Sequence, residues 1–170
     1  MSYSPERKIP APSSVERDEA GRLVGLVIDS AHPFAEGAAG IWLVAVDGSQ
    51  HALRAVAEAQ RMAAALKTCR LHLLNVQPWC SKEAAETEPA RHGWEATAAA
   101  RELLDTAGHP WRLHIAIGDP AERAVELANR LHCTGLVIGC RGQGVTHSLL
   151  FGSVAYKIMH MSQLPVLLVR

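Results

Sequence analysis

Two glycine-containing segments near the end of the sequence have residue types suited to binding a phosphate. The first contains Gly139, Arg141 and Gly142, and the second is Gly152 followed by Ser153. Glycine lets the backbone approach an anion closely, and the amino terminus of a helix supplies unpaired N–H donors with a partial positive charge. The Ser153 hydroxyl adds another donor. Together these segments indicate a phosphate site within residues 139–153.

Simpler structural roles are open for the same residues. Glycines that follow a strand are often only turn residues, and Gly152 with Ser153 could merely cap a helix. Asp47 follows an apolar run, where its carboxylate could accept hydrogen bonds from a ribose hydroxyl or an adenine amine. The same carboxylate could instead cap the helix that follows it.

The elements that must position these residues follow from the hydrophobic pattern. Short apolar runs predict five strands, at residues 41–46, 71–76, 113–117, 136–139 and 165–169. Helical spacing of apolar residues predicts four helices, at residues 52–66, 96–107, 120–131 and 152–161, the third with Asp119 as its N-cap and Pro120 in its first turn.

Apolar strands that alternate with helices are typical of a parallel sheet covered on both faces, and right-handed crossovers favour a doubly wound arrangement. Binding sites in such sheets lie at the carboxyl ends of the strands, where the strand order reverses. Asp47 and Gly139 both fall at such strand ends. The pattern therefore predicts an α/β domain over residues 41–170 with its site at this edge of the sheet.

The first forty residues have a different composition. Four prolines, several serines and mixed charges occur there, and only residues 23–28 are apolar enough to pack. We expect residues 1–40 to form an extension that is disordered or loosely packed. An extra edge strand at Leu23–Asp29 is the alternative, although Gly25 in its middle argues against a well-packed strand.

Composition restricts the classes of partner. The chain has 170 residues, of which 48% are hydrophobic, which suits one well-filled core. Lysine plus arginine equal aspartate plus glutamate at 17 each, so no net positive field exists to attract nucleic acid or an anionic membrane. No apolar segment has the pattern of a signal peptide or a membrane span, so a cytoplasmic location is expected.

The cysteines do not have the spacing of a metal site. Cys69, Cys80, Cys133 and Cys140 are widely separated, and reduced thiols are expected. A zinc site that combines Cys133 with the adjacent His132 is an unfavourable alternative, because sequence neighbours rarely bind one tetrahedral metal.

The spacing of the glycines resembles a known signature. Gly139, two residues, Gly142, nine residues, then Gly152 and Ser153 is similar to the pattern G-x2-G-x9-G-[S/T] of ATP-binding universal stress proteins. The similarity extends over residues 42–170. Two loop positions depart from the family pattern, since Cys140 stands where serine or threonine is usual and Gln143 replaces a frequent basic or small residue.

The resemblance implies a Rossmann-like, doubly wound, five-stranded parallel sheet of order 3-2-1-4-5 with four helices. It also implies an adenine nucleotide, ATP or else ADP or AMP, with Mg²⁺ on the phosphates. The family commonly forms homodimers through the last strand, here Val166–Val169. The residues that would meet the nucleotide are Ala45, Val46, Asp47, Val76, Gly139, Arg141, Gly142, Gly152, Ser153 and Val154.

We therefore expect an ATP-binding stress-response module whose nucleotide occupancy regulates its contacts with a partner protein. A Walker lysine motif is absent from the sequence, so no dedicated catalytic activity is expected, while weak ATP hydrolysis is open. His147 in the loop is a candidate base. The alternatives are a slow ATPase or phosphotransfer enzyme, and a structural stress protein that binds no nucleotide.

Overall fold

The computed structural model of the chain describes residues 9–34, 40–66, 69–79, 87–142 and 151–170. The strands in these ranges are β1 (Ser14–Arg17), β2 (Leu23–Asp29), β3 (Gly40–Ala45), β4 (Cys69–Gln77), β5 (Trp111–Ile117), β6 (Gly135–Gly139) and β7 (Val166–Val169). The helices are α1 (Gln50–Leu66), α2 (Glu88–Ala96), α3 (Ala98–Thr106), α4 (Pro120–Arg130) and α5 (Ser153–Met161).

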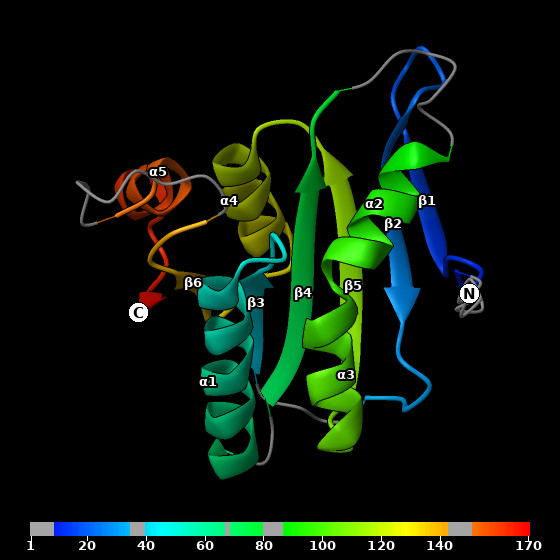
Figure 1. Cartoon of the computed structure of the whole chain (residues 1–170). Coiled ribbons are helices and arrows are strands. Elements are labelled where there is room, and N and C mark those ends of the chain that lie inside the picture. The colour runs from blue at the N-terminus through cyan, green and yellow to red at the C-terminus, as the bar shows by residue number, and fades with distance from the viewer. Residues whose placement is uncertain (1–8, 35–39, 67–68, 80–86, 143–150) are drawn as a thin grey trace, which may run out of the picture.

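All seven strands form one sheet of order β1-β2-β5-β4-β3-β6-β7. The five strands from β5 to β7 are parallel, and β1 and β2 are antiparallel additions beside β5. Helices α1, α2 and α3 cover one face of the sheet, and α4 and α5 cover the other (Figure 1). The predicted Rossmann-like parallel arrangement is thus confirmed, but the predicted count was wrong, because the described residues form seven strands and five helices.

The two additional strands, β1 and β2, come from the amino-terminal extension. Leu23, Leu26 and Ile28 of β2 are buried in the same core as α1 and α3. Gly25, which argued against a strand here, lies under β1, where an added side-chain carbon would be 3.2 Å from Glu16 Oε2. The glycine is therefore compatible with the strand, because β1 pairs with β2 at this point and the Glu16 side chain occupies the space next to Gly25. The four residues of β1 are exposed, and its charged side chains protect the sheet edge.

The additional helix is α2, which precedes the helix predicted at residues 96–107, and a break at Thr97 separates it from α3. The buried Thr97 hydroxyl donates to the Gly93 carbonyl at 2.8 Å, and it accepts a hydrogen bond from Arg101 Nε. Threonine bonds of this kind to the preceding turn bend helices. Gly93 also lets α2 lie close to β5, because an added side-chain carbon would be 2.8 Å from Ile115. The chain therefore changes direction between α2 and α3.

The start of α4 agrees with the sequence prediction. The Asp119 side chain accepts hydrogen bonds from the backbone N–H groups of Ala121 and Glu122, each at 3.0 Å, and Pro120 is in the first turn. No helix in the described part of the chain is long and apolar enough to cross a membrane.

The packing of β2 leads to a stability prediction. Ile28 is 1% exposed in the core, whereas Val15 on the neighbouring β1 is 48% exposed. We expect Ile28→Ala to lower the free energy of unfolding by about 2 to 5 kcal/mol, because it leaves a cavity in the core. Urea denaturation measures this change. The matched variant Val15→Ala should change the stability by less than about 0.5 kcal/mol, and equal effects of the two variants would contradict the packing of β2.

Candidate functional site

A cavity of about 210 Å³ lies beside the carboxyl ends of β3, β4 and β6. All ten residues predicted to meet a nucleotide line it: Ala45, Val46, Asp47, Val76, Gly139, Arg141, Gly142, Gly152, Ser153 and Val154. Five further residues complete the lining, namely Ala52, Leu74, Pro120, Ile138 and Ala155. The fold thus brings together residues that are more than one hundred positions apart in the sequence.

The strand order explains why a cavity forms at this place. From the central β3 the chain passes through α1 to β4 on one side, and β6 pairs with β3 on the other side. The connections that leave β3 and β6 therefore run in opposite directions and open a crevice between the two strand ends. The amino-terminal ends of α1, α4 and α5 contribute Ala52, Pro120 and Ser153 to its walls. Three helix amino termini with partial positive charge thus face this region.

The three glycines of the site have different structural roles. Gly139 packs on the first turn of α1, because an added side-chain carbon would lie 2.7 Å from the His51 carbonyl carbon. An added carbon on Gly142 would lie 2.5 Å from Asp47 Oδ2. At Gly152 the nearest contact would be an ordinary 3.4 Å, and its φ of −71° is open to any residue. Of the three, only Gly139 meets backbone atoms that cannot shift, so only there does the fold itself require a small residue. At Gly142 the requirement is set by the position of the Asp47 side chain.

The amino terminus of α5 is available to an anion. Gly152 is the N-cap residue, and among the described residues no side chain caps this end of the helix. Gly152 N–H donates to the Cys140 carbonyl at 2.8 Å, which joins the two halves of the glycine loop. The first N–H groups of α5 therefore lack the side-chain acceptor that usually pairs with them.

Charged groups in the cavity are few. Arg141 and Asp47 are the only charged side chains among the described residues that line it. Arg141 makes no hydrogen bond or ion pair within the part of the chain that the structure describes. Lys157 lies nearby on α5 but pairs with Asp119 at 2.9 Å. Hydrogen bonds from the Glu122 backbone and from Lys157 lower the pKa of Asp119, which keeps the N-cap of α4 ionised.

Asp47 orders the turn before α1 and lines the cavity, but it does not cap the helix. Its Oδ1 accepts a hydrogen bond from the Ser49 backbone N–H at 2.9 Å and fixes the turn before α1. The cap of α1 itself is Ser49, whose hydroxyl accepts from Ala52 N–H at 3.1 Å. Asp47 also lines the cavity beside Gly142. Its carboxylate therefore orders the turn while it faces the site.

The sequence did not identify Asn75, a buried residue that holds the end of β3 in place next to the cavity. Asn75 is 2% exposed, and its Nδ2 donates to the Val46 carbonyl at 2.8 Å. Gln77 Nε2 in turn donates to Asn75 Oδ1 at 2.6 Å. These bonds hold the end of β3 beside β4. A buried amide in an otherwise apolar strand was the signal that could have identified this residue.

Three further positions that the sequence singled out lie either outside the described residues or outside the lining of the cavity. Gln143 and the candidate base His147 lie outside the described residues. Cys140 does not line the cavity, and its Sγ lies 3.5 Å from His51 Nδ1. No group of three or more histidine, cysteine or acidic residues that could hold a metal ion occurs among the described residues.

Comparisons with known proteins agree with this geometry. The sequence model of the universal stress protein family matches residues 41–170. The stress response protein NhaX of Bacillus subtilis (strain 168) is 40% identical over 76 residues, which are 45% of this chain and 46% of that protein. The match to NhaX thus spans about half of the length of that relative.

Two further matches extend over most of the domain. A universal stress protein of Thermus aquaticus, from the QAH/OAS sulfhydrylase 3' region, is 33% identical over 132 residues, which are 75% of this chain and 96% of that protein. The crystal structure of a universal stress protein in complex with cAMP is 26% identical, with a TM-score of 0.63, and the match covers 79% of this chain and 99% of that chain. The chain therefore belongs to the universal stress protein family.

Proposed function

We propose that the chain is an ATP-binding stress-response module, a homodimer in which nucleotide occupancy regulates contacts with a partner protein. The observation that carries the proposal is the uncapped amino terminus of α5, which meets Gly142 and Arg141 in one cavity. Backbone donors, a helix dipole and a guanidinium together form a site suited to phosphate. A related universal stress protein forms a complex with cAMP, which supports an adenine nucleotide here.

The other end of the cavity suits an adenosine. Leu74, Val76 and Ile138 give it apolar walls, and Asp47 supplies an acceptor for a hydroxyl or an amine. In the proposal Ala45, Val46 and Asp47 meet the adenosine, and Val76 meets adenine through its backbone. Gly139, Arg141 and Gly142 meet the ribose and the first phosphates.

The outer phosphates belong at Gly152, Ser153 and Val154 in this proposal. Mg²⁺ accompanies them, because this ion usually binds through phosphate oxygens and water rather than through an all-protein cage. ADP or AMP would use the same adenosine contacts and fewer of those at α5. In this proposal, nucleotides with different numbers of phosphates therefore differ in their contacts at the α5 end of the cavity.

The cavity favours binding over turnover. Fast phosphoryl transfer needs metal-held phosphates and a residue that positions the attacking group. Within the described lining Asp47 is the single carboxylate, and it already accepts a hydrogen bond from Ser49. We therefore propose a nucleotide-responsive module without dedicated catalytic activity.

The proposed dimer uses the open edge of the sheet at β7. The four residues of β7 are half-buried and apolar, whereas the opposite edge strand β1 is exposed and carries charged side chains. An apolar unpaired edge is a site for pairing with another strand.

The phosphate end of the site is tested with Gly152→Val. We expect this variant to lose nucleotide affinity by at least tenfold while it keeps its fold, because the φ at this position is ordinary and the branched side chain would enter the phosphate space. Isothermal titration with ATP and Mg²⁺ measures the affinity. Ala107→Val, at the exposed end of α3, is the control and should bind normally. Equal affinity of both variants would overturn the placement of the phosphates.

The identity of the nucleotide is tested on the purified protein. Perchloric acid should release an adenine nucleotide, and ATP with Mg²⁺ should raise the melting temperature of the stripped protein. At one hundred times its dissociation constant, a ligand stabilises the folded state by about 2.7 kcal/mol. An extract without nucleotide, together with an unchanged melting temperature, would favour a structural protein that binds none.

The dimer is tested with two substitutions at Leu168. The carbonyls of Pro165 and Val169 accept hydrogen bonds from β6, so the alternate residues Val166 and Leu168 direct their backbone groups to the open edge. Leu168→Pro removes the outward N–H, whereas Leu168→Ala loses similar side-chain packing and keeps that N–H. Light scattering should show a monomer for the proline variant and a dimer for the alanine variant. A dimer in both cases would contradict pairing through β7.

A further inference from the structure

Two histidines are buried on the sheet face that α4 covers, the face to which Leu74 and Val76 of the cavity also belong. His72 of β4 is 3% exposed and His114 of β5 is 8% exposed. His72 Nδ1 and His114 Nε2 are 2.9 Å apart and form a hydrogen bond. One of the two nitrogens must accept this bond, so at least one imidazole is neutral while the pair is intact.

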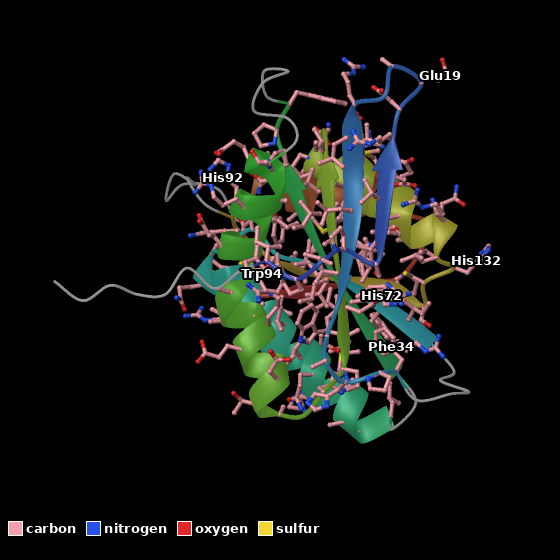
Figure 2. All side chains as sticks on the ribbon, turned by 90° about the vertical axis from the view of Figure 1, so that its right-hand side faces the viewer. Glu19, Phe34, His72, His92, Trp94 and His132 are labelled. Carbon is pink, nitrogen blue, oxygen red and sulfur yellow. The ribbon has the colours of Figure 1, made fainter. Side chains whose placement is uncertain are left out.

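The amino-terminal extension covers this pair. The Phe34 ring stacks on the His72 ring, with ring centres 5.5 Å apart and an angle of 6° between the planes. Val27 of β2 lies opposite His114 in the antiparallel register. Figure 2 shows Phe34 and His72 near one another at the side of the sheet to which β1 and β2 belong. His114 lines a cavity of about 220 Å³ between β1, β2 and α4. The extension and α4 thus together limit the contact of both imidazoles with water.

The surroundings of the pair are mainly cationic. Arg70 of β4, Arg112 of β5 and Arg130 of α4 act on it, against Asp29 of β2. Asp29 is already paired with Arg112, and Arg130 is paired with Glu16 of β1 at 2.6 Å. The same wall of α4 carries Arg123 and Glu126, which pair with each other. A proton on either histidine would add a positive charge among guanidinium groups.

Both histidines are consequently held in the neutral form. Burial lowers the pKa of His72 below its ordinary 6.5, and Arg112 and Arg70 lower it further. Burial also lowers the pKa of His114, with added contributions from His72, Arg112 and Arg130. The two shifts have the same direction and the same principal cause, which is removal of the rings from water.

We propose that the His72–His114 pair is an acid-sensitive latch, and that proton uptake by the pair releases β1, β2 and Phe34 from the parallel part of the sheet. The extension is the part that leaves, because β1 and β2 join the rest of the sheet through β5 alone, whereas α4 packs on α5, β4 and β3. β4 and β5 lie inside the sheet, paired on both sides, and are covered by α2 on their other face. None of the residues of the latch lines the nucleotide cavity.

The sign of the effect follows from proton linkage. In the open state the exposed rings regain an ordinary pKa near 6.5, whereas in the closed state the pKa is lower. The closed state is therefore fully favoured above this pH and loses its advantage as the pH falls below it. Two protons are taken up on opening, so the opening constant rises up to about one hundredfold per pH unit. Opening uncovers the edge of β5 and the apolar side chains of β2.

Hydrogen exchange on the full chain tests the latch. Amide protection, corrected for the intrinsic effect of pH, is compared between β2 and the central β3 at pH 7.5 and pH 5.0. We expect β2 to lose protection by at least tenfold more than β3 over this range. Equal losses in both strands would show global unfolding and would overturn the proposal, as would unchanged protection of β2.

Two sets of variants assign the effect to the pair. The double variant His72→Phe with His114→Leu should keep β2 protected at pH 5.0, since neither side chain can take up a proton. His92→Gln with His160→Gln, at two exposed positions, should leave the acid effect intact. NMR titration of the wild-type imidazoles serves as a direct measurement that does not depend on the folding of the double variant. Two rings that titrate near 6.5 while β2 remains protected would contradict the latch.

Discussion

The close approach of β6 to α1 is the constraint on which the site depends. Gly139 is the last residue of β6 and packs against the backbone of His51. A side-chain carbon at this position would lie 2.7 Å from the His51 carbonyl carbon. This contact fixes where the chain leaves the sheet, so that Gly142 lies beside Asp47 from the neighbouring β3. The bond from Gly152 to the Cys140 carbonyl then brings the start of α5 to the same point. A bulkier residue at 139 would displace every one of these groups together.

The same geometry explains how a chain without net charge can favour an anion. Positive and negative side chains balance at 17 each, so attraction over long distance is weak. Attraction within the cavity comes instead from oriented backbone N–H groups and from Arg141, and these act only over short distances. Such a site selects a ligand by shape and by close contact. It therefore suits a resident nucleotide better than a fast encounter with many phosphorylated molecules.

The sequence predicted the features that a local residue pattern determines, but not those that depend on contacts between distant segments. The apolar runs predicted the five parallel strands, and the resemblance to the family named the ten residues now found in one cavity. Strand β2 was only the alternative to a disordered extension, because the sequence does not reveal that β1 pairs beside Gly25 and places the Glu16 side chain next to it. Likewise, the bond between Asn75 and the Val46 carbonyl depends on the register of β3 and β4, which no local pattern reveals.

The two edges of the sheet together limit how copies of the chain can assemble. Strand β1 ends one side with exposed, charged residues, whereas β7 ends the other side with apolar ones. With one pairing edge, two copies can meet through the same surface and close, and no third copy can be added. The extension would matter for the proposed dimer as well as for packing, because it covers the edge of β5. Removal of that cover by acid would give each copy two pairing edges, and a chain with two such edges can form open arrays.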